Sequence, residues 1–176
     1  EGEEEGGEGE EEGGFFIDDE ELLQKERGLI NDNEMLAPGI VFESSAGHVD
    51  LGNALHKERP LRVDYVAEYL QSGGRLDGVR VVESGVDLTN EDVIGPHQAF
   101  YLQRMESCCA SSNPNKINIE ASQYKSIYLT SESFASAKRA AGSLCGIAEG
   151  VVEGRYGGGF AVVRPPGHHA EPGGAG

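Results

Sequence analysis

Apolar positions are most regularly spaced in the second half of the chain, over about residues 131–153. Phe, Ala, Leu and Val recur there at three- and four-residue steps, which predicts a helix with one apolar face. A second series, Gly142, Gly146, Gly150 and Gly154, recurs every fourth residue. We interpret this stripe as a surface on which the helix packs closely against a sheet, with Gly154 ending the helix.

Two further helices are expected upstream. Residues 61–71 place apolar side chains on one face, with Pro60 at the start and a Ser-Gly-Gly sequence after the end. The four residues that begin at Thr89 resemble a capping box, which predicts a helix running on to about Met105. Residues 107–123 carry Ser, Asn and Pro, and we interpret them as a loop or an insertion.

Three short segments, at residues 80–84, 127–129 and 160–163, are strand candidates. The last run is apolar at every position, as expected for a strand inside a parallel sheet. Because strands and helices alternate, we expect an α/β layered fold that begins between about Leu36 and Val41. A chain of 176 residues is long enough for one domain with a sizeable core.

Charge is distributed unevenly along the chain. The formal net charge is −17, but residues 1–21 contain twelve of the 31 acidic residues and no Lys or Arg, which leaves −5 for the rest. We expect residues 1–35 to be a disordered acidic flank, either a solubilising segment, which is the commoner case, or a tail that attracts basic partners such as histone tails. The remainder is mildly acidic, which argues against a direct nucleic-acid partner because phosphates require a basic face.

The cysteines and the lengths of the apolar runs indicate in which cellular compartment the protein is expected. The three cysteines, Cys108, Cys109 and Cys145, form neither an even set nor a Cys-x-x-Cys pair. We expect reduced thiols in a cytosolic or nuclear protein, the alternative being a vicinal disulfide. No apolar run approaches the roughly 20 residues of a membrane span, so no membrane association is expected. No signal peptide is visible, but the chain opens on Glu1 rather than Met, which leaves an upstream signal open.

The strongest candidate chemistry is the string Arg-Pro-Pro-Gly-His-His-Ala-Glu at residues 164–171, which follows an apolar strand. Adjacent histidines would point to opposite sides of a strand, but in a loop both can converge on one cavity. Sites in α/β sheets lie at the carboxyl ends of strands, where His168 and His169 fall. The two prolines fix the backbone, and Gly167 permits a sharp turn or the close approach of a ligand. The string predicts a proton-transfer pair; the alternative is a surface pair without a role.

This string also resembles the tandem-histidine signature of zinc-dependent histone deacetylases, especially those of class II. Residues 56–62 are similar to the family's His-Pro-Glu-x-Pro-x-Arg sequence, with Lys57 in the usual proline position. Residues 97–101 are similar to its His-x-x-x-Tyr helix, and residues 126–129, 133–134 and 140–143 follow the strand and helix that precede the histidines. Order and spacing agree over about residues 40–172.

The resemblance implies an arginase/deacetylase-like α/β fold, a three-layer parallel sheet flanked by helices, of which residues 36–176 would be the N-terminal part. It implies hydrolysis of N-acetyl-lysine to lysine and acetate with one Zn²⁺ ion. Carried over by position, His169 would be the general base and His168 would support the charge of the transition state. Arg62 and Gly167 would line the substrate pocket.

The family's zinc ligands, an Asp-x-His pair and a later Asp, have no counterpart in the chain. We therefore expect them downstream of Gly176, and we expect residues 1–176 alone to be inactive. The parent protein would act on acetylated histones or other acetyl-lysine proteins, with a co-repressor complex as a candidate partner, in the nucleus, the cytoplasm or both. The alternatives are a hydrolase similar to acetylpolyamine amidohydrolases and a catalytically inactive, deacetylase-like binding module.

Overall fold

The computed structural model describes residues 36–175 except positions 54, 84, 86, 126, 168 and 169, so the predicted acidic flank lies outside the described residues. Helices and strands alternate through the described part. In chain order the elements are β1 (Gly39–Glu43), α2 (Leu61–Gln71), the 3₁₀ turn η1 (Ser72–Gly74), β2 (Arg80–Val82), α3 (Asn90–Ile94), α4 (Ala99–Cys109), α5 (Pro114–Ala121), α6 (Ser133–Val152), β3 (Gly159–Val163), β4 (Ala170–Glu171) and β5 (Gly174–Ala175).

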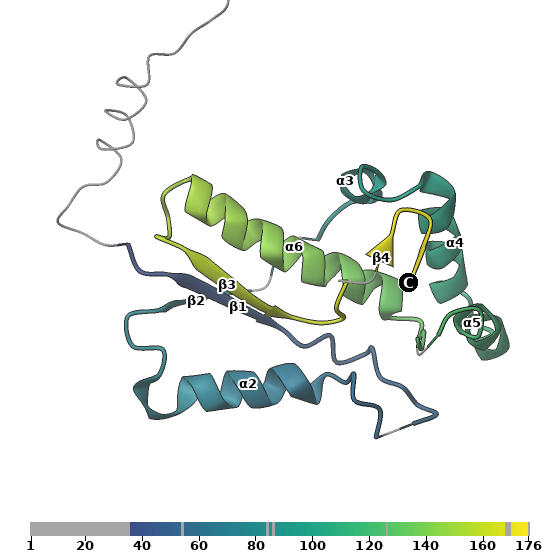
Figure 1. Ribbon diagram of the computed structural model, residues 1–176, viewed down its shortest axis with the longest axis horizontal. Coiled ribbons are helices and arrows are strands. Elements are labelled where there is room, and N and C mark those ends of the chain that lie inside the picture. The colour runs from purple at the N-terminus through teal and green to yellow at the C-terminus, as the bar shows by residue number, and fades with distance from the viewer. Residues whose placement is uncertain are drawn as a thin grey trace, which may run out of the picture. The chain divides into compact units, whose positions relative to one another are not determined.

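Three strands form a parallel sheet in the order β2-β1-β3 (Figure 1). The register pairs Gly39 of β1 with Arg80 of β2 and with Gly159 of β3. Parallel neighbours require long crossover connections, which α2 supplies between β1 and β2. The strands β4 and β5 form a separate antiparallel pair after β3.

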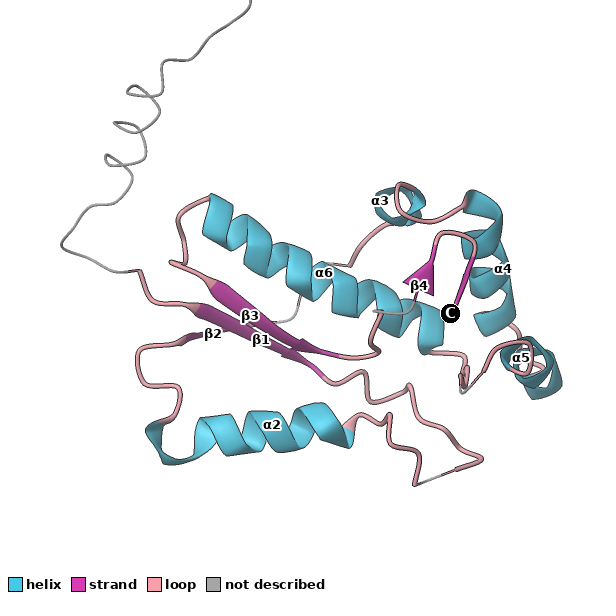
Figure 2. Cartoon of the chain, viewed as in Figure 1, coloured by secondary structure: helices cyan, strands magenta, loops and turns pink. Residues whose placement is uncertain are grey.

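Helices cover both faces of the parallel sheet, α6 on one side and α2 on the other (Figure 2). On the α6 side, Val41 packs with Ile147 and Tyr156, and Val82 and Ala161 lie against this cluster. Since side chains alternate along a strand, the other side chains of these strands point to the opposite face of the sheet, which α2 covers. The three layers confirm the predicted α/β architecture of a parallel sheet flanked by helices.

The α2 side of the sheet is only partly covered. Ile40 in the central strand is buried, whereas its register partners Val81 and Phe160 are 52% and 66% exposed. We predicted that the run at 160–163 would be a buried strand. The strand forms, but Phe160 is exposed and residues 161–163 are only partly buried, so the predicted burial is wrong. In the described residues β3 pairs on one side only, so its outer edge lacks a strand neighbour there.

Both long helices lie within their predicted limits, but the apolar face predicted for α6 is wrong. Leu144 and Val151 of that face are 54% and 37% exposed, and the buried side of α6 consists mainly of small residues with Ile147. The helix α2 spans the predicted residues 61–71, and α6 begins and ends within two residues of its predicted limits. Gly154 follows the α6 cap residue with a φ of +71°, a left-handed conformation that favours glycine. Gly150 also lies against the ring of Tyr156, where an added Cβ would be 2.2 Å from Cε2, so α6 packs closely there against the segment before β3 and not against the sheet itself.

The segment between residues 89 and 123 differs from its prediction. The capping box forms, since the Thr89 hydroxyl accepts a hydrogen bond from the Asp92 backbone N–H and the Asp92 carboxylate accepts one from the Thr89 N–H. The helix nevertheless stops at Ile94 and a new helix starts at Ala99, because Gly95-Pro96 interrupts it.

The predicted loop at 107–123 is also wrong, since α4 continues to Cys109 and α5 follows. Asn113 caps α5 by accepting a hydrogen bond from the Asn115 N–H, and Pro114 occupies the first turn, where no N–H is needed. The predicted strand at 127–129 has no strand pairing. No helix in the described ranges is long and apolar enough to cross a membrane.

Candidate functional site

The chain leaves β3 through a buried arginine. The Arg164 N–H donates to the carbonyl of Glu43 at 2.9 Å and so extends the pairing of β3 with β1 by one residue. The Arg164 carbonyl accepts a hydrogen bond from the Ser45 hydroxyl at 2.5 Å. Only 4% of Arg164 is exposed, and the peptide bond that joins it to Pro165 is cis. The loop that leads to the tandem histidines therefore starts from a fixed backbone.

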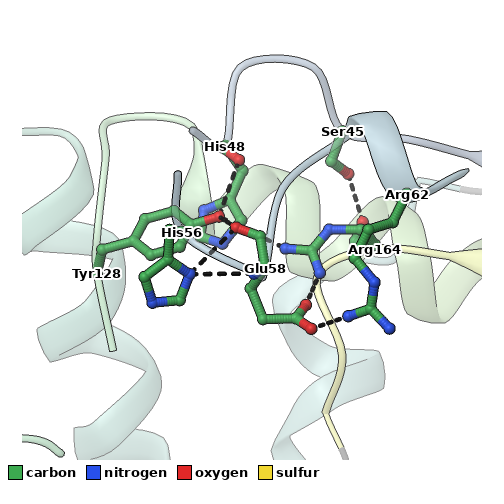
Figure 3. A network of polar contacts seen from close by, with 7 residues as sticks. All are labelled: Ser45, His48, His56, Glu58, Arg62, Tyr128 and Arg164. Atoms are coloured by element: carbon green, nitrogen blue, oxygen red, sulfur yellow. Dashed lines mark hydrogen bonds and ion pairs between the residues drawn. The ribbon is translucent and has the colours of Figure 1, made fainter. Parts of the chain in front are cut away.

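The Glu58 carboxylate joins two arginines (Figure 3). One oxygen pairs with the Arg164 guanidinium, whose side chain is 5% exposed, and the other with Arg62, four residues further along the chain, whose side chain is 58% exposed. Two cations on one carboxylate leave a net positive charge at this point. The structure thus connects Arg62, a predicted pocket residue, to the start of the tandem-histidine loop through Glu58.

Tyr128 and His56 hold the loop that carries Glu58. The Tyr128 hydroxyl donates to the Glu58 carbonyl at 3.0 Å, lies 3.2 Å from the His48 carbonyl and accepts a hydrogen bond from Arg164 Nη2 at 3.4 Å. The Glu58 N–H donates to Nδ1 of His56 at 3.1 Å, and the His56 ring stands edge-on to that of Tyr128. Burial raises the pKa of the Tyr128 hydroxyl, and the negative charge of Asp50 adds to this effect, so the hydroxyl stays protonated and remains a donor.

His48 lies beneath this network. Its ring stacks on Tyr128, and its Nδ1 is 2.8 Å from Oγ of Ser133 at the start of α6. Burial lowers the pKa of His48 to about 4, because the charged imidazolium would lose its hydration. The histidine is therefore neutral at pH 7. The neighbouring Asp50 accepts hydrogen bonds from Gly52 and Asn53, as expected for an Asx-type turn.

A second set of contacts holds the chain after the tandem histidines. The Gln98 N–H donates to the carbonyl of Pro172 at 2.7 Å, and Nδ1 of His97 lies 3.2 Å from the carbonyl of Glu171. The Ala170 N–H donates to the carbonyl of Gly167 at 2.9 Å. The start of α4 therefore anchors the hairpin of β4 and β5.

The four predicted site residues fare differently. His168 and His169 lie outside the described residues, so their assigned roles stay predictions. Arg62 is on the α2 surface in an ion pair with Glu58. Gly167 has no positive φ, and an added Cβ would meet no described atom within 4 Å, so the described residues do not require glycine there. Its proposed closeness to a ligand also stays a prediction.

Sequence reasoning assigned no role to Glu58, Arg164 or Tyr128, although all three lie inside the segments quoted above. For the two charged residues the signal is an isolated charge in an apolar or proline-rich context: Arg164 directly follows a fully apolar strand, and such a charge needs a partner when it is buried. No sequence pattern indicates that the partner is Glu58. Among the residues that the structure describes, no group of three His, Cys, Asp or Glu side chains could hold a metal ion.

The parallel sheet between helices, with polar loops gathered at the carboxyl ends of β1 and β3, defines an α/β protein of the class that binds ligands at that edge. The family model described as "Histone deacetylase domain" matches residues 56–176, and the chain belongs to this family. It is 32% identical over 162 residues to "Histone deacetylase HDA1" of Saccharomyces cerevisiae, which covers 85% of this chain and 22% of the relative. It is 34% identical over 148 residues to "Histone deacetylase 18" of Arabidopsis thaliana, with 84% and 20% covered.

A solved structure, the "Crystal Structure of HDA15 HD domain", shares the fold with a TM-score of 0.65 at 23% identity. The match covers 78% of this chain and 37% of that one. The chain thus spans about a fifth of the length of the curated relatives it matches. Together with the family match, this fold likeness supports the predicted class II-like histone deacetylase, and the chain accounts for only part of such a domain.

Proposed function

We propose that the complete protein is a lysine deacetylase that hydrolyses N-acetyl-lysine to lysine and acetate. The observation that carries the proposal is the family match over residues 56–176, which includes the Arg-Pro-Pro-Gly-His-His-Ala-Glu string. Relatives named histone deacetylases make acetylated histones the first substrate to test, with other acetyl-lysine proteins next. The nucleus, the cytoplasm or both, and a co-repressor complex, are the corresponding expectations for location and partners.

In this proposal the tandem histidines move the protons. His169 accepts a proton from the water whose oxygen forms the new bond to the acetyl carbon. It returns that proton to the lysine nitrogen as the carbon–nitrogen bond breaks, so that acetate and the free amine leave. His168 keeps its own proton and stabilises the negative charge that develops on the acetyl oxygen. Adjacent imidazoles titrate as a coupled pair, so the pH–rate profile reports on both together.

The family resemblance also implies a zinc ion. The described residues do not form a cluster that fits it, so we expect its ligands beyond Gly176 and expect residues 1–176 alone to be inactive. Arg62 and Gly167 remain proposed pocket residues. For Arg62 the support is its link through Glu58 to the start of the tandem-histidine loop.

The test is a deacetylase assay on acetyl-lysine histone peptides with the complete protein loaded with zinc. We expect turnover, and a loss of about 10²–10⁴-fold in kcat for His169→Ala, the usual contribution of a positioned acid–base group. The matched control is Glu149→Ala on the exposed surface of α6, which should keep full activity.

Each other result points to a specific error. Near-full activity of His169→Ala would refute the general-base role. Hydrolysis of acetylpolyamines but not of acetyl-lysine peptides would replace the substrate class. Turnover of neither, in a folded zinc-loaded protein, would favour the inactive binding module.

A further inference from the structure

We propose that the Glu58–Arg164 ion pair is a positioning device that holds the tandem-histidine loop in place for proton transfer. The inference rests on the proposed function and deepens it, because it assigns the two residues a role in the reaction without any contact with the substrate. They act through the backbone that leads to His168 and His169.

Arg164 is held at every polar part of its backbone and by its side chain. Its N–H bonds to Glu43 in β1, its carbonyl accepts from Ser45, and its guanidinium binds Glu58 and Tyr128. Pro165 and Pro166 follow directly, and their rings fix φ. Because these residues have little backbone freedom, the orientation of Arg164 largely determines the position of Gly167, the last described residue before the histidines.

The other end of the same segment is held independently. The hydrogen bond from Gln98 to the carbonyl of Pro172 ties it to the start of α4. The Ala170 N–H bonds back to the carbonyl of Gly167, so the described residues on the two sides of the histidines are joined directly. With both ends anchored, the Glu58–Arg164 pair determines the angle at which the loop leaves the sheet.

The pair is poorly explained as a device for stability alone. Removing the Arg164 guanidinium from water has a large free-energy cost, and apolar residues of similar volume often stabilise a buried position as well or better. The ion pair between the 5% exposed Arg164 side chain and the 33% exposed Glu58 side chain does, however, fix the direction in which the guanidinium points. Glu58 also lies outside any helix or strand and is placed by Tyr128 and His56, so several residues contribute to putting one carboxylate at Arg164.

The ion pair between Arg155 and Glu153 provides a matched comparison. Its side chains are 47% and 60% exposed, the residues are two apart in sequence, and both precede β3, so they lie at the opposite end of that strand from Arg164. Glu153→Gln should therefore remove an ion pair without disturbing the tandem-histidine loop.

The experiment compares Arg164→Lys, Glu58→Gln and Glu153→Gln in the complete protein, with two measurements on each. The first is hydrogen exchange at the Ala170 amide, which needs neither zinc nor activity. The second is the separation of kcat from KM on an acetyl-lysine peptide. We expect the Arg164 and Glu58 variants to exchange Ala170 about tenfold faster or more. We also expect them to lose about 10–100-fold in kcat with KM within about threefold, because a small displacement of a catalytic group reduces the rate of the chemical step. Glu153→Gln should change neither quantity.

Unchanged Ala170 exchange and kcat in folded Arg164→Lys and Glu58→Gln proteins would overturn the inference while leaving the deacetylase proposal intact. If Arg164→Lys does not fold, Glu58→Gln decides, since glutamine has nearly the shape of glutamate and removes the negative charge of the ion pair. If the wild-type protein proves inactive on all acetylated substrates, the proposed function fails, and with it the catalytic half of the inference. The Ala170 measurement then still decides whether the pair holds the loop.

Discussion

The rings of His48 and Tyr128 stack with their centroids 4.5 Å apart and their planes 21° from parallel. One ring face of each is thereby shielded from water, in a part of the chain that has neither helix nor strand. The stacked pair connects the loop after β1 to the segment before α6. This arrangement is stable only while His48 is uncharged, because a protonated imidazole buried at this position would lose its hydration by water.

Stability should therefore fall in mild acid. The folded protein holds the pKa of His48 at about 4, whereas an unfolded histidine has about 6.5. Between these values the unfolded state binds the extra proton, so the contribution of His48 is complete above about pH 6.5 and is lost as the pH falls towards 4. We expect a decrease in the free energy of unfolding of about 3 kcal/mol at most, measured by urea denaturation at several pH values.

The control is His48→Gln, which keeps hydrogen-bonding groups and cannot titrate in this range. Its stability at pH 7 should be lower than that of the wild type, and its decline between pH 6.5 and 4 should be smaller. Identical pH dependence in the two proteins would show that other groups cause the decline.

Replacement by alanine should have very different effects at Gly158, directly before β3, and at Gly159, the first residue of β3. An added Cβ on Gly159 would lie 2.2 Å from Cγ2 of Ile147, a side chain that is 3% exposed in the core beneath α6, whereas one on Gly158 would meet nothing within 4 Å. We expect Gly159→Ala to cost about 1–3 kcal/mol through overpacking and Gly158→Ala to change stability by less than about 0.5 kcal/mol. Thermal unfolding of the two variants measures the difference; equal melting temperatures would contradict the close approach of α6 to β3.

The three cysteines should differ in their reactivity towards thiol reagents. Cys108 and Cys109 are buried in α4, and desolvation raises the pKa of both thiols, which lowers their thiolate fraction. Cys145 is exposed on α6. In native protein we expect a thiol reagent to modify Cys145 alone, and all three after unfolding. A single reactive thiol in the unfolded, unreduced protein would instead indicate the vicinal disulfide between the adjacent pair.

The elements with strong periodicity could be predicted from the sequence, and those that depend on distant partners could not. The apolar spacing of α6 and its terminating Gly154 are local features of the sequence, so the limits of this helix were predicted to within two residues. The strand β1 carries only a short apolar run at Ile40–Phe42. Its identity as the central strand depends on β2 and β3, which are far away in the chain. We predicted no strand there, only that folded structure would begin nearby.

The site shows the same division. The tandem-histidine string and the arginine at position 62 are recognisable from residue type and order, because proton transfer and charge pairing need particular groups. The Glu58–Arg164 pair is not recognisable, since a sequence gives no distance between residues so far apart. Its existence depends on β3 pairing with β1, which brings Arg164 past Ser45 and towards the loop that carries Glu58.

The same pairing has a consequence for synthesis of the protein. The register matches Gly39 with Gly159, so the central strand leaves the ribosome long before the partner for one of its two edges. At 5–20 residues per second the intervening chain takes roughly 6–24 s to translate. Through that interval β1 has an open edge of apolar residues, and non-local pairing of this kind is slow to form. The nascent chain is therefore most exposed to mispairing with its neighbours on a polysome before β3 emerges, and a chaperone that covers residues 39–43 would act in that interval.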